Sequence, residues 1–306
     1  MTIRSFKDSD SFWDRVTIPS NLLIKTGTYT GNGSDPRSIT GVGFQPKFVF
    51  IGATTGTGDP SGGIWKSADM PTGATGQSAS FGDNGRDSVG TISSLDADGF
   101  TVRAQKNLNA TTYYYVALGG TDIVTGTYTG NGSDNRNITG IGFLPKWVII
   151  QGSTNHTVHK STITGDSTDN TQYGTIIADL SNAIQALNSD GFQVGTDGTV
   201  NTNTATYYYV AIKGSGVNSL TYTGNGSDNR NITGAGFEPK AVFIKGTGTS
   251  AAVFRTGEPG DLTSNVQATA APEANLIQSL SSDGFQVGTD AKVNGNGVTY
   301  RAIVLT

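Results

Sequence analysis

The chain contains no cysteine, so neither a disulfide nor a thiolate metal site can contribute to its fold. Histidine is nearly absent too, with two residues in 306. Charged side chains make up only 14% of the sequence, and the net charge of -4 lacks the surplus of lysine and arginine that phosphate binding requires. We therefore expect no nucleic-acid partner, and we expect packing and hydrogen bonds alone to stabilise the fold.

Long hydrophobic runs are also missing. No apolar stretch approaches the roughly 18 residues that a membrane helix needs, and the first segment, MTIRSFKDSDSFWDRV, has no apolar core of a secretory signal. We expect no membrane partner and no cleaved leader. Glycine is abundant instead, with 43 residues, alongside threonine, tyrosine and valine in short runs. Such a composition is typical of turns and β-strands.

One sequence block is repeated three times along the chain. TYTGNGSDNRNITG stands at residues 127–140 and again at 221–234, and a copy with two differences stands at 28–41. Each copy continues into a Gly-Phe-x-Pro-Lys element, later carries Asp-Gly-Phe, and closes with a β-rich aromatic run such as TYYYVA. The period of about 92–99 residues is the size of a domain rather than of a solenoid coil.

The sequence therefore predicts an all-β fold of three tandem antiparallel β-sandwich domains, about 95 residues each, after a short N-terminal arm. The expected boundaries are 1–21 for the arm and 22–119, 120–214 and 215–306 for the repeats. The short joints and the complete set of motifs in each copy predict that each repeat folds as an independent module with its own core.

Within a copy, the turn residues predict the local structure. Asn-Gly in the opening block predicts a tight hairpin, and Asp-Gly predicts a second turn before the strand FQVGT. The tyrosine-rich closing run predicts a strand buried on both faces. Only residues 182–188 and 273–281 have any helical character. The phenylalanines beside the proline corner, Phe44, Phe143 and Phe237, are expected to be equivalent core anchors.

The repeated asparagine, aspartate and arginine of the opening block form the first candidate site, where oxygen atoms could bind calcium or a glycan. Under the structural alternative, which we favour, the aspartate caps the turn and the arginine pairs with it or packs on a tyrosine. One aspartate per copy provides too few carboxylates for a calcium loop. The residues of this set are Asn32, Asp35 and Arg37, Asn131, Asp134 and Arg136, and Asn225, Asp228 and Arg230.

Motifs for other chemistry are weak. His156 and His159 are three residues apart in a segment that resembles a strand or loop, and no third zinc ligand is evident. The sequence holds no Gly-x-Ser-x-Gly nucleophile elbow, and its glycine-rich stretches carry no Gly-Lys-Ser/Thr phosphate cradle. We therefore predict no metal, no cofactor and no catalytic residue, and we favour a binding or structural protein over an enzyme.

The order of these motifs resembles a known family. Tyr-x-Gly-Asn-Gly, then Ile-x-x-Gly-Phe-x-Pro-x-x-Val-x-Ile, then Asp-Gly-Phe-x-Val-Gly, and finally Val-Asn and Tyr-x-x-x-Ala are similar to a repeated all-β domain of tailed-phage structural proteins, of the decoration or tail-fibre-like kind. The resemblance covers nearly the whole chain after its first twenty or so residues, and it implies no reaction. Because the chain shows no extended fibre stalk, we place it with decoration proteins rather than tail fibres.

The expected function is therefore that of a non-enzymatic structural protein on the exterior of a phage virion, above all a capsid decoration or cement protein that is assembled in the bacterial host cytoplasm. Its partner would be the major capsid protein or another virion protein, and three like domains, or a trimer of chains, could occupy a threefold or quasi-threefold point. The first alternative is an adhesion module of the tail or capsid that binds host surface glycan. The second is a carbohydrate-active enzyme, whose carboxylates need not be neighbours in sequence.

The N-terminal arm has no counterpart in the repeats. It combines charges with bulky apolar side chains, and large aromatics are effective interface anchors. We expect the arm to dock the protein on the particle through Phe6, Phe12, Trp13 and Arg15. The alternative is that Trp13 folds back onto the first repeat.

Overall fold

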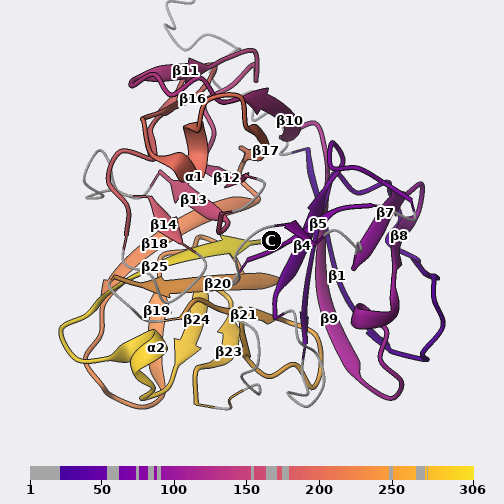
Figure 1. Ribbon diagram of the computed structural model, residues 1–306. Helices are drawn as coiled ribbons and strands as arrows, with labels where there is room; N and C mark the ends of the chain where they lie inside the picture. The colour runs from indigo at the N-terminus through magenta and orange to yellow at the C-terminus, as the bar shows by residue number, and fades with distance from the viewer. Residues whose placement is uncertain are drawn as a thin grey trace, which may run out of the picture.

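The computed structural model describes residues 21–53, 62–73, 76–81, 86–87, 91–152, 155–162, 171–173, 179–247, 251–266, 273 and 275–306. These residues form three successive units of the same architecture, and each unit consists of two antiparallel sheets (Figure 1). The predicted fold class, three tandem antiparallel β-sandwich domains, is confirmed. Within the described part of the chain, no helix is long and apolar enough to cross a membrane.

The larger sheet of each unit has the closing strand of that unit between the opening strand and the strand after the proline corner. In the first unit the strands, in sheet order, are β1 (Leu22–Thr30), β9 (Thr112–Gly120), β3 (Phe48–Ala53), β4 (Ile64–Ser67), β5 (Ser78–Ser80) and β6 (Arg86–Asp87). In the second they are β10 (Ile123–Thr129), β17 (Thr206–Ile212), β12 (Trp147–Gln151), β13 (Val158–Ser161) and β14 (Gln172–Tyr173). In the third they are β18 (Val217–Thr223), β25 (Thr299–Leu305), β20 (Ala241–Gly246), β21 (Val253–Thr256) and β22 (Ser264–Asn265). The closing run is buried on both faces, as its sequence predicts.

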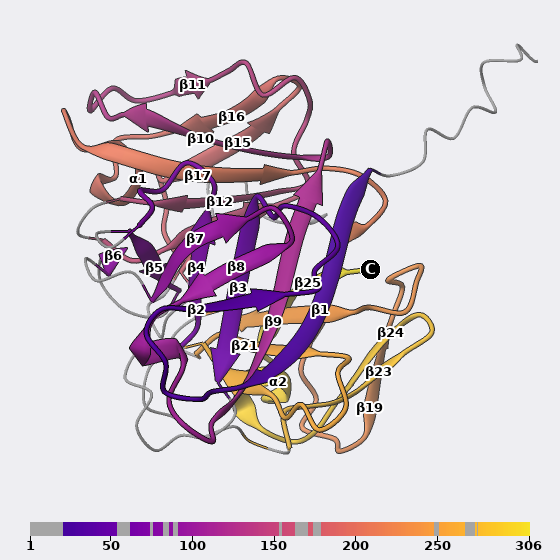
Figure 2. The same cartoon turned by 90° about the vertical axis from the view of Figure 1, so that its right-hand side faces the viewer.

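The smaller sheet of each unit has three strands and covers one face of the larger sheet, as Figure 2 shows for the first unit. In sheet order, these strands are β2 (Arg37–Thr40), β8 (Gly99–Val102) and β7 (Ile92–Asp96), then β11 (Arg136–Ile138), β16 (Gly191–Val194) and β15 (Ile184–Asn188), then β19 (Arg230–Thr233), β24 (Gly284–Val287) and β23 (Ile277–Ser281). Alternate apolar side chains of the two sheets meet between them. In the second unit, for example, Phe192 and Val194 join Val148 and Ile150 in one buried cluster.

The predicted opening hairpin is wrong. The strands before and after Gly-Asn-Gly-Ser-Asp belong to different sheets, since β10 pairs with β17 and β11 pairs with β16. The loop therefore crosses from the larger sheet to the smaller one instead of reversing within a single sheet. Its glycine does take the predicted positive φ, which is 69° at Gly132. The second predicted turn is correct, because Asp190 lies in the two-residue connection of the β15–β16 hairpin.

The two segments with helical character are strands rather than helices. Residues 182–188 contain β15, and residues 273–281 contain β23. The described helical elements lie elsewhere and are single turns: the 3-10 turn η2 (Ala104–Lys106), α1 (Gly198–Asn201) and α2 (Ala291–Asn294). Asp197 and Asp290 cap α1 and α2 by accepting from the backbone N–H two residues on. The pairing of β15 and β23 with a neighbouring strand overrides their weak local preference.

The corner phenylalanines anchor the edge of each core rather than its centre. Phe44, Phe143 and Phe237 are only half-buried, and each packs against the rim of the core of its own unit. The residues after the proline corner enter the interior instead. Phe48 and Trp147, for example, are completely buried.

A fourth apolar core lies where the three units meet, at the centre of Figure 1. The second face of every larger sheet contributes to it through equivalent positions of the strand after the proline corner and of the closing strand. Those residues are Phe48, Phe50, Val116 and Leu118, then Trp147, Ile149, Val210 and Ile212, then Ala241, Phe243, Ile303 and Leu305. Ring contacts cross this centre, with Phe243 5.0 Å from Phe50 and 5.5 Å from Trp147 between ring centroids.

Hydrogen bonds join every pair of units around this centre. Between the first and second units, the Trp65 Nε1 donates to Thr157 Oγ1 at 2.9 Å. Between the second and third, the Lys146 Nζ donates to the Val217 carbonyl at 3.2 Å. The third unit closes the ring on the first, since Gly63 N donates to the Val266 carbonyl at 3.0 Å. Each unit has a core of its own, as predicted. The second face of each larger sheet is covered by the other units, however, so we no longer expect the units to fold independently.

Candidate functional site

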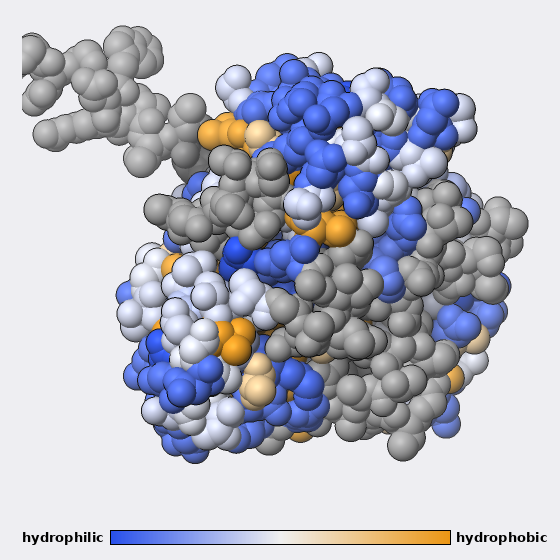
Figure 3. Space-filling view, turned by 60° about the vertical axis from the view of Figure 1, so that its left-hand side comes forward, coloured by the Kyte–Doolittle hydropathy of each residue, from blue (hydrophilic) through white to orange (hydrophobic). Residues whose placement is uncertain are grey.

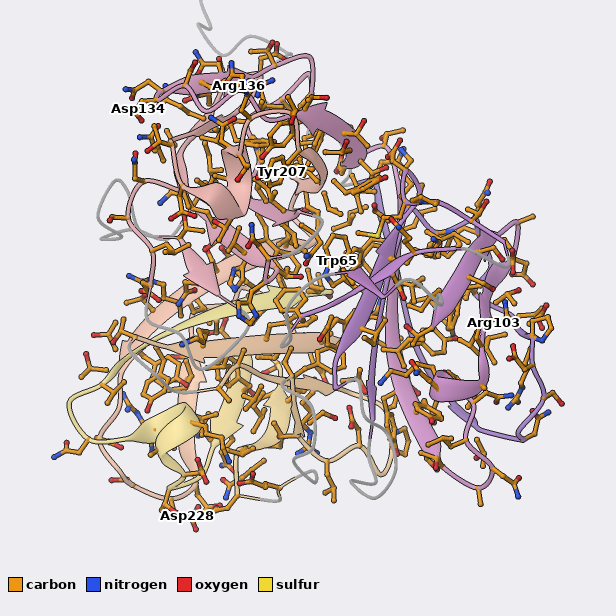
Figure 4. All side chains as sticks on the ribbon, in the orientation of Figure 1. Trp65, Arg103, Asp134, Arg136, Tyr207 and Asp228 are labelled. Atoms are coloured by element: carbon orange, nitrogen blue, oxygen red, sulfur yellow. The ribbon has the colours of Figure 1, made fainter. Side chains whose placement is uncertain are left out.

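The repeated asparagine, aspartate and arginine lie in the loop that leads from the larger to the smaller sheet. In Figure 4, Asp134 and Arg136 of the second unit and Asp228 of the third lie at opposite ends of the molecule, with Arg103 of the first at a third corner and Trp65 near the centre. The chain thus presents three versions of one loop at three separated places.

Each loop is organised by a buried asparagine from the far end of the unit. Asn201, at the end of α1, is fully buried. Its Oδ1 accepts from Asn131 N at 3.0 Å and from Arg136 Nη1 at 3.2 Å, and its Nδ2 donates to the Ser133 carbonyl at 2.7 Å and the Gly195 carbonyl at 2.9 Å. Asn294 makes the same four bonds in the third unit, and Asn107 bonds the corresponding loop atoms in the first. These four bonds use the full capacity of the amide.

The arginine of the loop packs on the ring of the tyrosine in the opening strand, and this pair occurs in each repeat. The Arg136 guanidinium lies 5.4 Å from the ring centroid of Tyr128 and donates to the Thr129 carbonyl at 2.6 Å. The Tyr128 hydroxyl donates to the Val200 carbonyl at 2.7 Å, and burial raises its pKa well above the usual value. The tyrosine therefore stays neutral, and its ring is a platform for the arginine.

The aspartate of the loop differs between copies. Asp134 Oδ1 accepts from Asn135 N at 2.9 Å and from Gln185 Nε2 at 2.8 Å, and Asp228 has the equivalent partners in the third unit. In the first unit, Asp35 forms an ion pair with Arg103 instead. These contacts hold the loop in place. Within the described residues, no three His, Cys, Asp or Glu side chains are grouped so that they could hold a metal ion.

A second carboxylate in every unit, the aspartate of Asp-Gly-Phe, binds the Gly-x-Gly segment before the proline corner. Asp190 accepts from Gly140 N at 3.0 Å and from Gly142 N at 2.6 Å. These two backbone hydrogen bonds lower the pKa of Asp190 although its side chain is exposed. Asp98 and Asp283 make equivalent bonds. Sequence reasoning identified this aspartate only as a turn residue.

The first unit has a hollow beside its loop. A cavity of about 220 Å³ is lined by Asp35, Thr91, Arg103, Ala104 and Gln105. Arg103 occupies the position that Gly195 and Gly288 hold in the other units, directly after the last residue of the central strand of the smaller sheet. The other two copies therefore cannot form the ion pair that Arg103 makes with Asp35.

The remaining candidates divide between the core and the undescribed part of the chain. Tyr207 and Tyr113 are buried inside their units, where each stacks on the opening tyrosine. His159 lies in the central core, and His156 is half-buried. Burial, with smaller contributions from Lys245 and Arg301, lowers the pKa of His159 to about 3. The arm residues Phe6, Phe12, Trp13 and Arg15 lie outside the described residues.

Sequence reasoning missed the buried asparagines. Their signal was present in the repeated Val-Asn dipeptide of the second and third copies, at Val200–Asn201 and Val293–Asn294. The first copy reads Lys106-Asn107 at this position, which weakens the pattern. An asparagine at the same place in three copies, after valine in two of them, indicates a buried hydrogen-bonding role, but its loop partner Asn131 lies 70 residues away in sequence.

The described part of the face in Figure 3 is predominantly hydrophilic. In the view of Figure 3, apolar residues are scattered among polar ones. Among the described residues, the exposed large hydrophobic side chains are Leu23, Leu144 and Leu262.

A family comparison covers most of the repeated part of the chain. The family described as a domain of unknown function (DUF7483) matches residues 19–122 and 213–303. The chain belongs to this family. The matched residues are those of the first and third units, and the second unit has the same strand order and the same asparagine-centred loop. A comparison with curated proteins gave no match.

Proposed function

We propose that this protein is a non-catalytic structural component of a phage particle, located on the particle exterior as a capsid decoration or cement protein. The observation that carries the proposal is the fusion of three like units around one apolar core, which presents the same loop at three corners of a single chain. A partner surface with local threefold or quasi-threefold symmetry offers three equal sites to such a molecule.

The hydrogen bonding of the loops supports a role in binding a partner rather than in catalysis. The polar atoms of the second and third loops bond one another and the buried asparagine, and the arginine is held against its tyrosine. Rigid loops of this kind lose little conformational entropy when they dock. Equal contacts made by three loops then add through high effective concentration.

The arm is the second part of the proposal. Phe6, Phe12 and Trp13 fasten the chain to the particle, and the partner is the major capsid protein or another virion protein. Assembly takes place in the cytoplasm of the bacterial host.

The experiment is co-sedimentation of the purified chain with particles that lack it, followed by imaging of the reconstituted particles. We expect the full chain to sediment with the particles and to appear at threefold or quasi-threefold positions of the capsid. A chain without residues 1–21 should keep its melting temperature and lose sedimentation. The control for overall integrity is Ser279→Ala, at an exposed position of β23 outside the arm and the loops, which should sediment like the wild type. Full-length chain that remains in the supernatant, or that appears at the tail alone, contradicts the proposal.

A second candidate function, binding of a host surface glycan, is favoured by the hollow of the first unit. The wall of the hollow is mostly apolar, as in sites where a sugar ring packs on carbon atoms, and Asp35, Arg103 and Gln105 are the polar side chains that would orient a sugar there. A glycan array tests it, with Arg103→Gly as the variant, because the other two units have glycine at that position. Glycan signal that disappears in Arg103→Gly and persists in Asp134→Asn supports this candidate, and an array without signal removes it.

A further inference from the structure

A small cavity lies at the junction of all three units. Its lining includes Phe81 of the first unit, Trp147 and His159 of the second, and Phe243, Lys245 and Arg301 of the third. The cavity volume of about 10 Å³ leaves room for one particle of the size of a water molecule. A sulfate, a phosphate or a sugar is too large for it.

Two side chains that line the cavity have nitrogen atoms without a hydrogen-bond partner. Trp147 Nε1 and His159 Nδ1 are both unpartnered, although Trp147 is completely buried and His159 is only 6% exposed. The contrast with Trp65 is direct, since its Nε1 donates to Thr157 at 2.9 Å. A buried N–H group without a partner is costly, so an occupant that accepts hydrogen bonds would stabilise this site.

The other polar side chains of the lining are cationic. Lys245 and Arg301 both line the cavity, and among the described residues no acidic side chain does. Asp179 accepts from the Arg301 Nη1 at 2.6 Å, and the Lys245 Nζ donates to the Gly246 carbonyl at 2.9 Å. Tryptophan, lysine and arginine can only donate, and a neutral histidine can donate from Nδ1. The lining therefore suits an occupant that only accepts and carries negative charge.

We propose that this cavity binds a single halide ion, chloride under ordinary conditions, which joins the three units through Trp147, His159, Lys245 and Arg301. The ion would accept hydrogen bonds from groups of the second and third units and would lie against Phe81 of the first. This inference is independent of the function proposed above, because it concerns how the three units are held together.

The repeats themselves supply the variants for a test. His159 occupies the position of Trp65 in the first unit and Phe254 in the third, since all three pair with the equivalent residue of the neighbouring strand. Trp147 occupies the position of Phe48 and Ala241. His159→Phe and Trp147→Phe therefore remove one donor each and insert a ring that the fold already accommodates at the equivalent site.

The first measurement is the melting temperature of the full chain in sodium bromide and in sodium gluconate at constant ionic strength. We expect the melting temperature to rise by about 2 °C for each tenfold increase in free halide above the dissociation constant. His159→Phe and Trp147→Phe should lose this specific rise. The control Trp65→Phe should keep it, because the indole that it removes already has a protein partner.

The second measurement needs no variant: a bromide-containing crystal of the wild-type chain, recorded at the bromine absorption edge. An anomalous peak in the cavity, within hydrogen-bonding reach of Trp147 Nε1, supports the proposal. A cavity that holds only water, or an equal response to halide in the wild type and in His159→Phe, overturns it.

Discussion

At the residue scale, Asn201 explains why the opening block is the same in each repeat. The loop after β10 runs between two sheets, so its backbone N–H and carbonyl groups have no ladder to pair with. The amide of Asn201 supplies both an acceptor and a donor there, with bonds to Asn131 and Ser133. Backbone groups that have no strand partner need another partner, and this side chain provides it.

The substitution Asn201→Leu tests this role. Leucine has a similar volume, but it leaves the Asn131 N–H without this acceptor and the Ser133 and Gly195 carbonyls without this donor, so the free energy of unfolding should fall by about 2–4 kcal/mol. Urea denaturation gives the measurement. The control is Asn137→Ala, an exposed asparagine, for which a change below about 0.5 kcal/mol is expected. A loss below about 1 kcal/mol for Asn201→Leu would show that the loop is stable without its buried amide.

Gly191 shows why the aspartate turn needs glycine. Its φ is +148°, and a Cβ at this position would lie 2.0 Å from the Ile138 carbonyl oxygen of the paired strand. Gly142 also has a positive φ, +82°, but nothing lies within 4 Å of a Cβ built on it. Comparison of the two glycines therefore distinguishes the cost of a positive φ from the cost of a clash between a Cβ and the neighbouring strand.

We expect Gly191→Ala to lower the free energy of unfolding by about 3 kcal/mol or more, because the strand pair must separate to admit the methyl group. Gly142→Ala should cost about 1–2 kcal/mol, the ordinary strain of a left-handed residue. Thermal unfolding of the two variants, compared with the wild type, is the measurement. Equal losses would mean that the contact with Ile138 relaxes without cost.

At the element scale, the aspartate turn of the smaller sheet is fastened to the segment before the proline corner. Asp190 accepts from two backbone N–H groups of Gly140 and Gly142, and the Ile141 N–H between them donates to the Asp190 carbonyl at 3.3 Å. One exposed aspartate thus sets the path by which β11 leaves its sheet and the chain turns toward β12. The three units share this arrangement.

The backbone hydrogen bonds of these three aspartates predict that the chain loses stability in acid. The backbone hydrogen bonds lower the pKa of Asp98, Asp190 and Asp283 in the folded chain below the usual value of 3.8. Their stabilising contribution is therefore present above pH 3.8 and is lost as the pH falls through the lower folded pKa. A chain with all three residues changed to asparagine should show a flatter melting temperature below pH 4 than the wild type. Parallel profiles of the two chains between pH 7 and pH 2.5 would contradict this assignment.

On the scale of the whole molecule, the central core makes the three units one cooperative structure. Phe50, Trp147 and Phe243 belong to different units, and all are less than 10% exposed in the full chain. Removing two units would expose the central face of the third, which carries Phe243, Phe254 and Ile303. Exposed apolar patches of this size promote association.

The excised residues 215–306 should therefore self-associate or bind a hydrophobic dye. The full chain should unfold in a single calorimetric transition whose van't Hoff and calorimetric enthalpies agree. Light scattering and calorimetry measure the two expectations. A fragment with Phe243→Gln and Ile303→Thr is the control, and it should be more soluble. A wild-type fragment that is monomeric and melts at the temperature of the full chain would show that the units are independent after all.

The candidate site was only partly predictable, because its two halves lie far apart in sequence. The opening block stood out by repetition, and the stacking of an arginine on a tyrosine follows from their types and spacing. The buried asparagine that joins them comes from α1, 70 residues away at its bond to Asn131. No local sequence pattern links the loop to Asn201, because the pairing of the opening strand β10 with the closing strand β17 brings them together.

The sequence by itself determined the number of units, the strand content, the turn at Asp-Gly and the burial of the tyrosine-rich strand, because each follows from local periodicity or from exact repetition. The opening loop illustrates the limit: Asn-Gly fits a hairpin equally well, and only sheet pairing decides whether the next strand returns or crosses to the other sheet. The tertiary structure alone decided what covers the second apolar face of each larger sheet. A strand that is apolar on both faces requires two partners, but it does not specify them, and here the second partner is the rest of the chain.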